Sequence, residues 1–135
     1  MFSKIRISRT NPSSFKEDIP EDLVKAITYM KCGRLQSAEK IIKELIDIFE
    51  YQFEELINSP LQYQKTNKHT LFLNEVVKLY PDNDMDLIEI LLSNGANPCL
   101  ADSDMMSAIT LAADMGKKNV LETLIASTLR SSMKI

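Results

Sequence analysis

Few side chains in this sequence of 135 residues are of a type that does covalent chemistry. The cysteines are Cys32 and Cys99, and the single histidine is His69. A histidine that takes the thiol proton would make either cysteine a nucleophile, which is the chemistry of a small cysteine enzyme. Cys32 lies at the end of a predicted helix, where the negative pole disfavours a thiolate, and Cys99 follows a proline in an apolar turn. We therefore expect reduced, unreactive thiols, a surface or capping role for His69, and no enzyme activity.

Three aspartates alternate just before a predicted helix: Asp82, Asp84 and Asp86. Calcium loops show a similar alternation, but they need a central glycine and a glutamate at the twelfth position, which is Ser93 here. Helix capping explains the same acids, since Asp84 or Asn83 can accept hydrogen bonds from the first turn. We predict no metal site and no bound cofactor.

The sequence contains three glycines, and each one follows a predicted helix. Glycine readily adopts the left-handed conformation that ends many helices. No glycine is left for a glycine-rich loop of the kind that binds phosphate, which argues against a nucleotide site. The three positions are Gly33, Gly95 and Gly116.

Composition narrows the class of protein further. The apolar fraction of 44% and the charged fraction of 26% are typical of a soluble globular protein, and the length suits one domain. A net charge of −3 and the lack of tryptophan argue against a nucleic-acid partner. No apolar run approaches the ~20 residues of a membrane span, and the N-terminus has no apolar signal core. We therefore expect a cytoplasmic protein without a membrane span.

Apolar residues recur at helical spacing along most of the chain, which predicts an all-α fold. We expect residues 1–19 to form a flexible tail, with a basic arm that orders on a partner as the alternative. Residues 20–135 are expected to form a single α-helical domain. It begins with a helical hairpin at 20–58, whose second helix runs from about 35 to 57 and has an acidic, solvated outer face.

Tyr29, Gly33 and Ala38 follow one another at spacings of four and five residues. In this spacing the hairpin is similar to a tetratricopeptide repeat. No second copy of about 34 residues follows, so the sequence predicts one αα-hairpin rather than an array.

Two short motifs stand at a fixed separation in the C-terminal half of the chain. The segment L-L-S-N-G-A-N at 91–97 is followed by S-A-I-T at 107–110 and then by A-A-D-M-G at 112–116. This order resembles the ankyrin repeat, in which L-L-x-x-G-A-[DN] is followed by T-P-L-H and A-A-x-x-G. Small alanines suit the close crossing of two antiparallel helices, and the glycines suit the turns.

The resemblance to ankyrin repeats covers residues 67–127. It gives one good repeat at about 102–127 and one degenerate repeat at about 67–101, where Glu75 and Val76 replace the paired alanines. It implies two stacked ankyrin-like helix-turn-helix repeats after the hairpin.

In ankyrin-like proteins the loop between repeats projects as a finger that helps to bind a partner protein. Two adjacent methionines at the predicted loop tip suit adaptable contacts, with folding of one or both into the core as the alternative. The acids beside them indicate a partner surface that is apolar with a basic rim. The predicted partner-binding residues are Asp102, Ser103, Asp104, Met105, Met106, Asp114 and Met115.

The resemblance therefore implies a non-catalytic protein-binding module, such as an adaptor, or an inhibitor or regulator of a partner protein. Lysine outnumbers arginine, as in AT-rich genomes, and ankyrin-type proteins of intracellular bacteria often act on host or bacterial proteins. The functions that the resemblance implies thus include a bacterial effector delivered into a host cytosol and a regulator of such an effector. The alternative is a helical homodimer, in which the acidic helix or an exposed repeat end pairs with a second copy.

Overall fold

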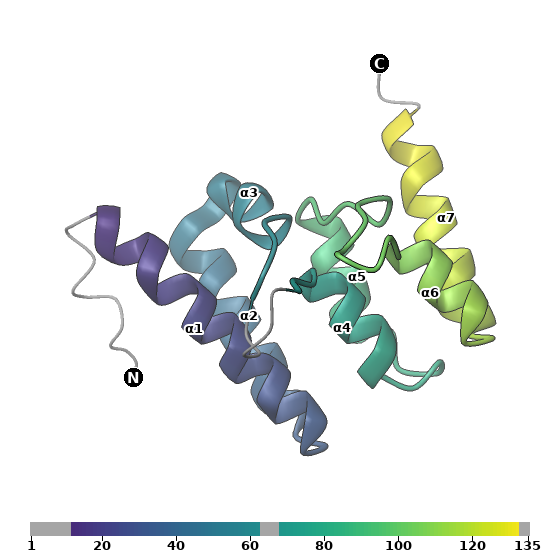
Figure 1. Cartoon of the computed structure of the whole chain (residues 1–135), viewed down its shortest axis with the longest axis horizontal. Coiled ribbons are helices and arrows are strands. Elements are labelled where there is room, and N and C mark those ends of the chain that lie inside the picture. The colour runs from purple at the N-terminus through teal and green to yellow at the C-terminus, as the bar shows by residue number, and fades with distance from the viewer. Residues whose placement is uncertain (1–11, 63–67, 133–135) are drawn as a thin grey trace. The chain divides into compact units, whose positions relative to one another are not determined.

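The computed structural model describes residues 12–62 and 68–132 (Figure 1). Over these residues the chain is helical and forms no strand beyond one isolated bridge, which confirms the all-α prediction. Its contacts divide the chain into two compact units with the boundary between Glu50 and Tyr51. None of the helices in the described ranges combines the length and the apolar character needed to cross a lipid bilayer.

The first unit contains a hairpin of two helices, α1 (Pro12–Lys31) and α2 (Leu35–Phe49), which contact each other. Gly33 has a φ of 79° in the turn between them, as predicted. The buried apolar side chains of both helices form the core of this hairpin. They are Leu23, Ala26, Ile27 and Met30 from α1, and Ala38, Ile42, Leu45 and Phe49 from α2.

The predicted start of the first helix, near residue 20, is wrong. Helix α1 begins at Pro12 and continues through Pro20. Proline is favoured at the first position of a helix, where its missing N–H is not needed, so Pro12 begins the helix rather than preventing it. The predicted tail at 1–19 is therefore helical from Pro12 onward, and residues 1–11 lie outside the described residues.

The predicted second helix, over 35–57, is also corrected. Helix α2 ends at Phe49, and Glu50 has a φ of 50° and a ψ of −124°. A 3₁₀ turn over Glu50–Gln52 leads into the short helix α3 (Phe53–Ile57). The apolar spacing continues through this bend, and no glycine or proline marks it, so the sequence carried no signal for the break.

Besides the short helix α3, the second unit contains four helices in two consecutive pairs. Helix α4 (Phe72–Leu79) contacts α5 (Asp86–Ser93), and α6 (Ala108–Asp114) contacts α7 (Lys118–Ser132). Between the pairs, α4 contacts α6 and α5 contacts α7 (Figure 1). Several of the side chains in this core are fully buried. They include Phe72, Val76, Val77, Leu87, Ile88, Leu91, Ala108, Ala112, Val120 and Leu124.

Two side chains join the end of α4 to the start of α7. The Asp82 carboxylate accepts hydrogen bonds from the backbone N–H of Asn119, at 3.2 Å, and of Val120, at 3.0 Å. Asp82 thus caps a helix that begins 36 residues later in the chain. In the opposite direction, Lys117 donates to the carbonyls of Val77 and Tyr80, and so satisfies acceptors at the end of α4. Burial lowers the pKa of Lys117, and the Asp82 carboxylate partly offsets this effect.

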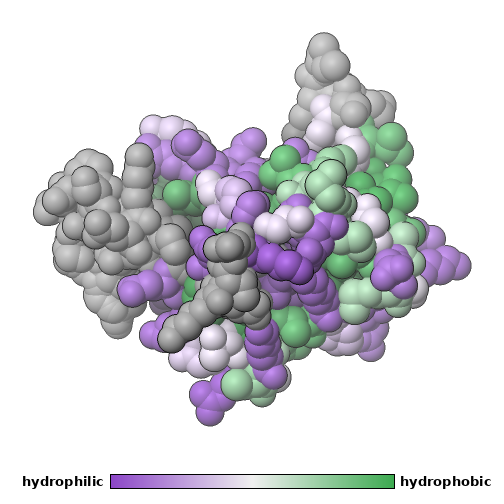
Figure 2. Space-filling view, in the orientation of Figure 1, coloured by the Kyte–Doolittle hydropathy of each residue, from purple (hydrophilic) through white to green (hydrophobic). Residues whose placement is uncertain are grey.

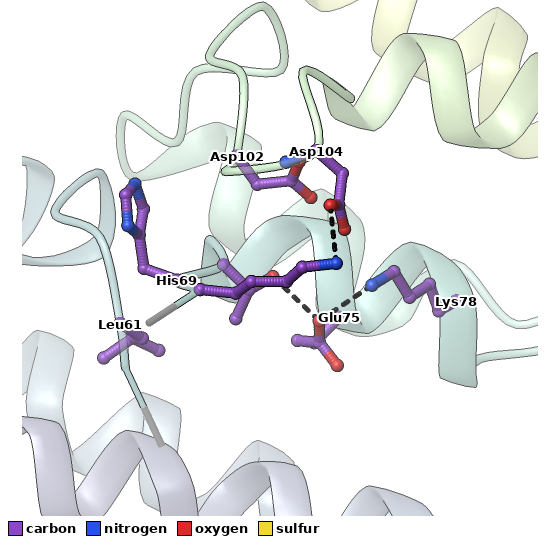
Figure 3. A pocket seen from close by; sticks show the side chains of 8 residues that line it. Leu61, His69, Glu75, Lys78, Asp102 and Asp104 are labelled. Atoms are coloured by element: carbon purple, nitrogen blue, oxygen red, sulfur yellow. Dashed lines mark hydrogen bonds and ion pairs between the residues drawn. The ribbon is translucent and has the colours of Figure 1, made fainter. Parts of the chain in front are cut away.

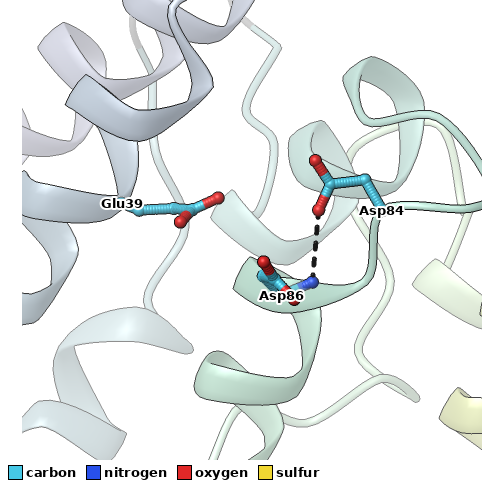
Figure 4. A group of neighbouring side chains, drawn as sticks. All are labelled: Glu39, Asp84 and Asp86. Atoms are coloured by element: carbon cyan, nitrogen blue, oxygen red, sulfur yellow. Dashed lines mark hydrogen bonds between the residues drawn. The ribbon is translucent and has the colours of Figure 1, made fainter.

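Capping was predicted for the aspartates at 82–86, but with a different helix as the target for Asp82. Asp84 accepts from the N–H of Asp86 at the start of α5, at a long 3.4 Å (Figure 4). The residue at the N-cap position of α5 is Met85, whose side chain makes no capping bond. The stronger of these two caps, at Asp82, therefore serves α7 rather than the neighbouring helix.

The turn after α5 is held by Asn58. Its side-chain amide donates to the carbonyl of Gly95 at 2.9 Å, and its side-chain oxygen accepts from the N–H of Asn97 at 2.8 Å. Gly95 has a φ of 98°, and a Cβ at this position would lie 2.5 Å from Cγ of Glu54. Both the backbone conformation and the close approach of Glu54 therefore require glycine here.

Candidate functional site

The predicted finger is a tight turn formed by residues 102–106. The backbone N–H of Asp102 donates to the carbonyl of Met106, and the N–H of Met105 donates to the carbonyl of Asp102, both at 3.0 Å. The Asp102 carboxylate accepts from the N–H of Asp104 at 2.9 Å and of Met106 at 3.1 Å. Aspartate is well suited to this role because its short side chain reaches backbone groups two residues on. The turn is therefore closed by bonds within itself.

A buried asparagine attaches this turn to helix α4. Asn74 donates from Nδ2 to the Asp102 carboxylate at 3.3 Å and to the carbonyl of Met106 at 2.9 Å. Both Asn74 and Asp102 are buried, so neither group has water as a ready substitute for these bonds. The carboxylate of Asp102 is thus used in bonds inside the chain rather than at the surface.

A second attachment runs from the finger to the segment before α4. Ser103 N–H donates to the carbonyl of His69 at 3.2 Å, and the N–H of His69 donates to Oγ of Ser103 at 2.7 Å. Lys68 also forms an ion pair with Asp104 at 3.1 Å, although both side chains are largely exposed. Exposed pairs of this kind contribute at most about 1 kcal/mol, so the backbone bonds at Ser103 are the firmer attachment.

Met105 lies at the tip of the braced turn. It is 81% exposed, and its φ of 64° places it in the left-handed region, which is uncommon for a methionine. Met106 is half-buried. The alternative in which the methionines fold into the core therefore does not apply to Met105, whose apolar side chain is held in solvent by a turn that the surrounding bonds determine.

A small polar pocket lies at the base of the finger (Figure 3). It has a volume of about 130 Å³, and four of its charged side chains form two ion pairs. The buried Glu75 carboxylate accepts from Thr70 Oγ1 at 2.8 Å and from Lys78 Nζ at 3.1 Å. Lys68 and Asp104 form the other pair. This arrangement stabilises the junction of the finger with α4.

Asp114 and Met115 lie at the other end of α6 from the finger. Helix α6 begins at Ala108, directly after the finger, and ends at Asp114. A helix of this length separates its two ends by roughly 10 Å, at 1.5 Å per residue. Both residues are exposed, with Met115 45% exposed. The structure therefore brings five of the seven predicted residues together in one turn and leaves these two apart from it.

The residues considered for covalent chemistry are all exposed. His69 precedes α4, and its backbone is used in holding the finger. Cys99 lies beside Thr128 of α7, with Sγ 3.8 Å from Oγ1. Cys32 belongs to the other unit, in the turn after α1.

Asn74, which carries the finger, was not singled out from the sequence. Its signal was present: it interrupts the apolar run L-F-L-N-E-V-V at 71–77 in the middle of a predicted helix. A polar side chain on a helix face that is otherwise apolar must find hydrogen-bond partners inside the protein. The sequence thus pointed to a buried polar contact, but not to the loop 28 residues away that supplies it.

Comparison of the chain with protein-family models, with curated protein sequences and with solved structures gives no match. The resemblance to ankyrin repeats therefore rests on the sequence motifs and stays a prediction.

Proposed function

We propose that this protein is a non-catalytic protein-binding module whose finger, residues 102–106, inserts Met105 into an apolar pocket of a partner protein. The observation that carries the proposal is the exposed Met105 side chain on a turn fixed by buried hydrogen bonds to α4. Large apolar side chains that are fully exposed are costly to keep in water, and a rigid loop prevents this one from folding back.

Rigid presentation favours binding because less conformational freedom is lost when the complex forms. Asn74 and the His69–Ser103 pair fix the backbone of the finger, so the partner has to order only the side chain of Met105. The unbranched thioether side chain can then adapt to the details of the pocket.

The charges near the exposed methionines indicate the chemistry of the partner. Asp104 is exposed next to Met105, and Asp114 is exposed next to Met115. An apolar pocket rimmed by lysine or arginine would complement the finger, and basic side chains on the rim would mainly increase the association rate. Binding of this kind suits an adaptor, or an inhibitor that occupies a functional surface of its partner.

The test is a comparison of the wild-type protein with the Met105→Arg variant in affinity capture from the native cell, followed by titration of the captured partner. We expect the affinity to fall at least about tenfold, as is usual when a central apolar contact is lost. The circular dichroism spectrum should stay unchanged, because the Met105 side chain contributes little to the core.

Tyr51→Arg is the matched control, because Tyr51 is 84% exposed and belongs to the same unit but not to the finger. Asn74→Ala tests the rigidity argument, since it retains Met105 and removes the brace. We expect weaker binding in this variant as well. If Met105→Arg binds as tightly as Tyr51→Arg, the interface lies elsewhere and the proposal fails.

A further inference from the structure

The methionines of this chain differ widely in their contact with solvent. Five of them belong to the described residues: Met30, Met85, Met105, Met106 and Met115. Met105 is 81% exposed, Met115 is 45% exposed, and Met85 and Met106 are half-buried. Met30 is buried in the core of the α1–α2 hairpin. Met105 is therefore the described methionine with the greatest contact with solvent.

A thioether in contact with water reacts with peroxides. The sulfur lone pair attacks one oxygen of hydrogen peroxide, so that an S–O bond forms and the O–O bond breaks. The leaving hydroxide takes the proton of the transferred oxygen and becomes water. Sulfur loses two electrons and the peroxide gains them, and the side chain becomes methionine sulfoxide. A buried sulfur reacts only when the structure opens locally, so exposure favours reaction at Met105.

The bonds that fix the finger do not depend on its methionine sulfur atoms. They join backbone groups of residues 102–106, the Asp102 carboxylate and the side chain of Asn74. The second attachment joins Ser103 to the backbone of His69. Oxidation at the tip therefore changes the surface of the finger and leaves its backbone in place.

The apolar character of the finger depends on a single exposed side chain. Figure 2 shows hydrophilic residues next to hydrophobic ones over the segment between α5 and α6. Within the finger, Asp102 is buried and Met106 is half-buried. Ser103 and Asp104 are exposed but polar. Of the five residues of the finger, Met105 is thus the one that exposes a large apolar side chain.

We propose that Met105 is an oxidation site, at which peroxide converts the thioether into a sulfoxide and thereby releases the partner without unfolding the protein. This inference rests on the proposed function of the finger. The sulfoxide is polar, and its oxygen accepts hydrogen bonds from water. Its burial in an apolar pocket without a donor should weaken binding at least about tenfold.

The first test measures where peroxide reacts. The full chain is treated with hydrogen peroxide, and peptide mapping by mass spectrometry gives the rate at each methionine. We expect Met105 to react severalfold faster than Met106, its neighbour in the same turn, and at least about tenfold faster than Met30. Circular dichroism should stay unchanged while Met105 is converted. Equal rates at Met105 and Met106, or loss of helical content as Met105 reacts, would overturn the proposal.

The second test compares the affinity for the captured partner before and after peroxide. A thiol reductant follows the peroxide, because it returns disulfides and sulfenic acids at the exposed Cys32 and Cys99 to thiols and leaves methionine sulfoxide in place. We expect the affinity to fall at least about tenfold and to recover after treatment with methionine sulfoxide reductases. Unchanged affinity after complete oxidation of Met105 would overturn the proposal.

Met105→Leu is the matched variant, because leucine is apolar, has a similar volume and contains no sulfur. Its affinity should be the same before and after peroxide. Met105→Gln places a polar side chain at the tip and should bind as weakly as the oxidised wild type. Met115→Leu keeps Met105 and should lose affinity on oxidation as the wild type does. If Met105→Leu also loses affinity after peroxide, oxidation acts through another residue and the proposal fails.

The proposed function and the oxidation site fail in different ways. If Met105→Arg binds the partner as tightly as Tyr51→Arg, the proposed function fails, and the release of the partner by oxidation fails with it. If Met105→Arg loses binding but the sulfoxide does not, the finger binds its partner and only the oxidation site is refuted.

Discussion

Replacing Asp82 by alanine removes both hydrogen bonds that its carboxylate accepts at the start of α7, from the N–H groups of Asn119 and Val120. Loss of an N-cap side chain costs about 1 kcal/mol and up to about 2 kcal/mol in well-structured sites. The Asp82 carboxylate also stabilises the charged form of Lys117, which is half-buried. We therefore expect Asp82→Ala to lower the free energy of unfolding by about 1.5 kcal/mol.

Urea unfolding, followed by far-ultraviolet circular dichroism, measures this loss. With a slope of about 1.5 kcal/mol per M, the midpoint of the second unit should fall by about 1 M. Hydrogen exchange of the α7 amides would locate the effect, because the first turn of this helix loses its cap. Asp82→Asn keeps an acceptor and loses the charge, so its cost should be smaller, about 0.5 kcal/mol.

The neighbouring aspartates provide matched controls for this prediction. Asp84 makes only the 3.4 Å contact to the N–H of Asp86, and both residues lie in the turn before α5 or in its first turn. Asp84→Ala and Asp86→Ala should each change the free energy of unfolding by no more than about 0.5 kcal/mol. If all three alanine variants lose the same stability, the acids act through their general charge, and the cap across the two helix pairs does not stabilise the unit.

Two further predictions concern the same unit. Burial lowers the pKa of Lys117 in the folded protein below its ordinary value of 10.5, which applies to the unfolded chain. Between the folded and the unfolded pKa, the unfolded chain therefore binds more protons than the folded protein. The free energy of unfolding of the wild type, relative to that of Lys117→Met, should thus rise with pH across this interval. Urea titrations of both proteins at several alkaline pH values measure this, and a difference that falls with pH would refute it. Gly95→Ala should destabilise by at least about 1 kcal/mol more than Gly116→Ala, since both positions have positive φ but only at Gly95 would a Cβ meet Glu54. Equal losses in the two variants would show that Glu54 moves aside without cost.

The sequence predicted those helix ends that depend on local chemistry. Gly33, Gly95 and Gly116 all have positive φ, and each lies in a turn between helices. Glycine is a direct signal of a left-handed backbone conformation, because few other residues adopt positive φ without strain. The apolar spacing predicted the helices of the second unit to within a few residues, since burial of one helix face leaves a regular pattern.

The end of helix α2, by contrast, could not be predicted from local residues. Glu50 adopts a positive φ although glutamate has no preference for it, and the apolar spacing carries on through Phe49 and Phe53. Strain of this kind costs of order 1–3 kcal/mol and persists because the surrounding structure requires it. A cause that lies in tertiary packing leaves no mark on the residue itself, so local patterns could not predict this end.

The candidate site was likewise predicted only in its local features. The sequence predicted that residues 102–106 form a loop with two methionines, but not which of its aspartates is buried and which is exposed. Asp102 is buried and bonded within the turn, whereas Asp104 is exposed. The difference depends on Asn74, a residue of α4 that becomes a neighbour only when the two helix pairs come together.

Three connections in the second unit share one means of support, since each is held by a polar side chain from a distant part of the chain. Asn58 holds the turn at Gly95, Asn74 holds the finger, and Asp82 holds the start of α7. In each case the supporting side chain belongs to an earlier segment and bonds to backbone groups, so it fixes the path of the loop. Exposed side chains such as Met105 take no part in these bonds, so the fold does not require a particular residue type there. An arrangement of this kind separates the residues that shape a loop from those that contact a partner. The chemistry at the tip of the finger can then change without loss of the fold, which is the property expected of a surface used for binding.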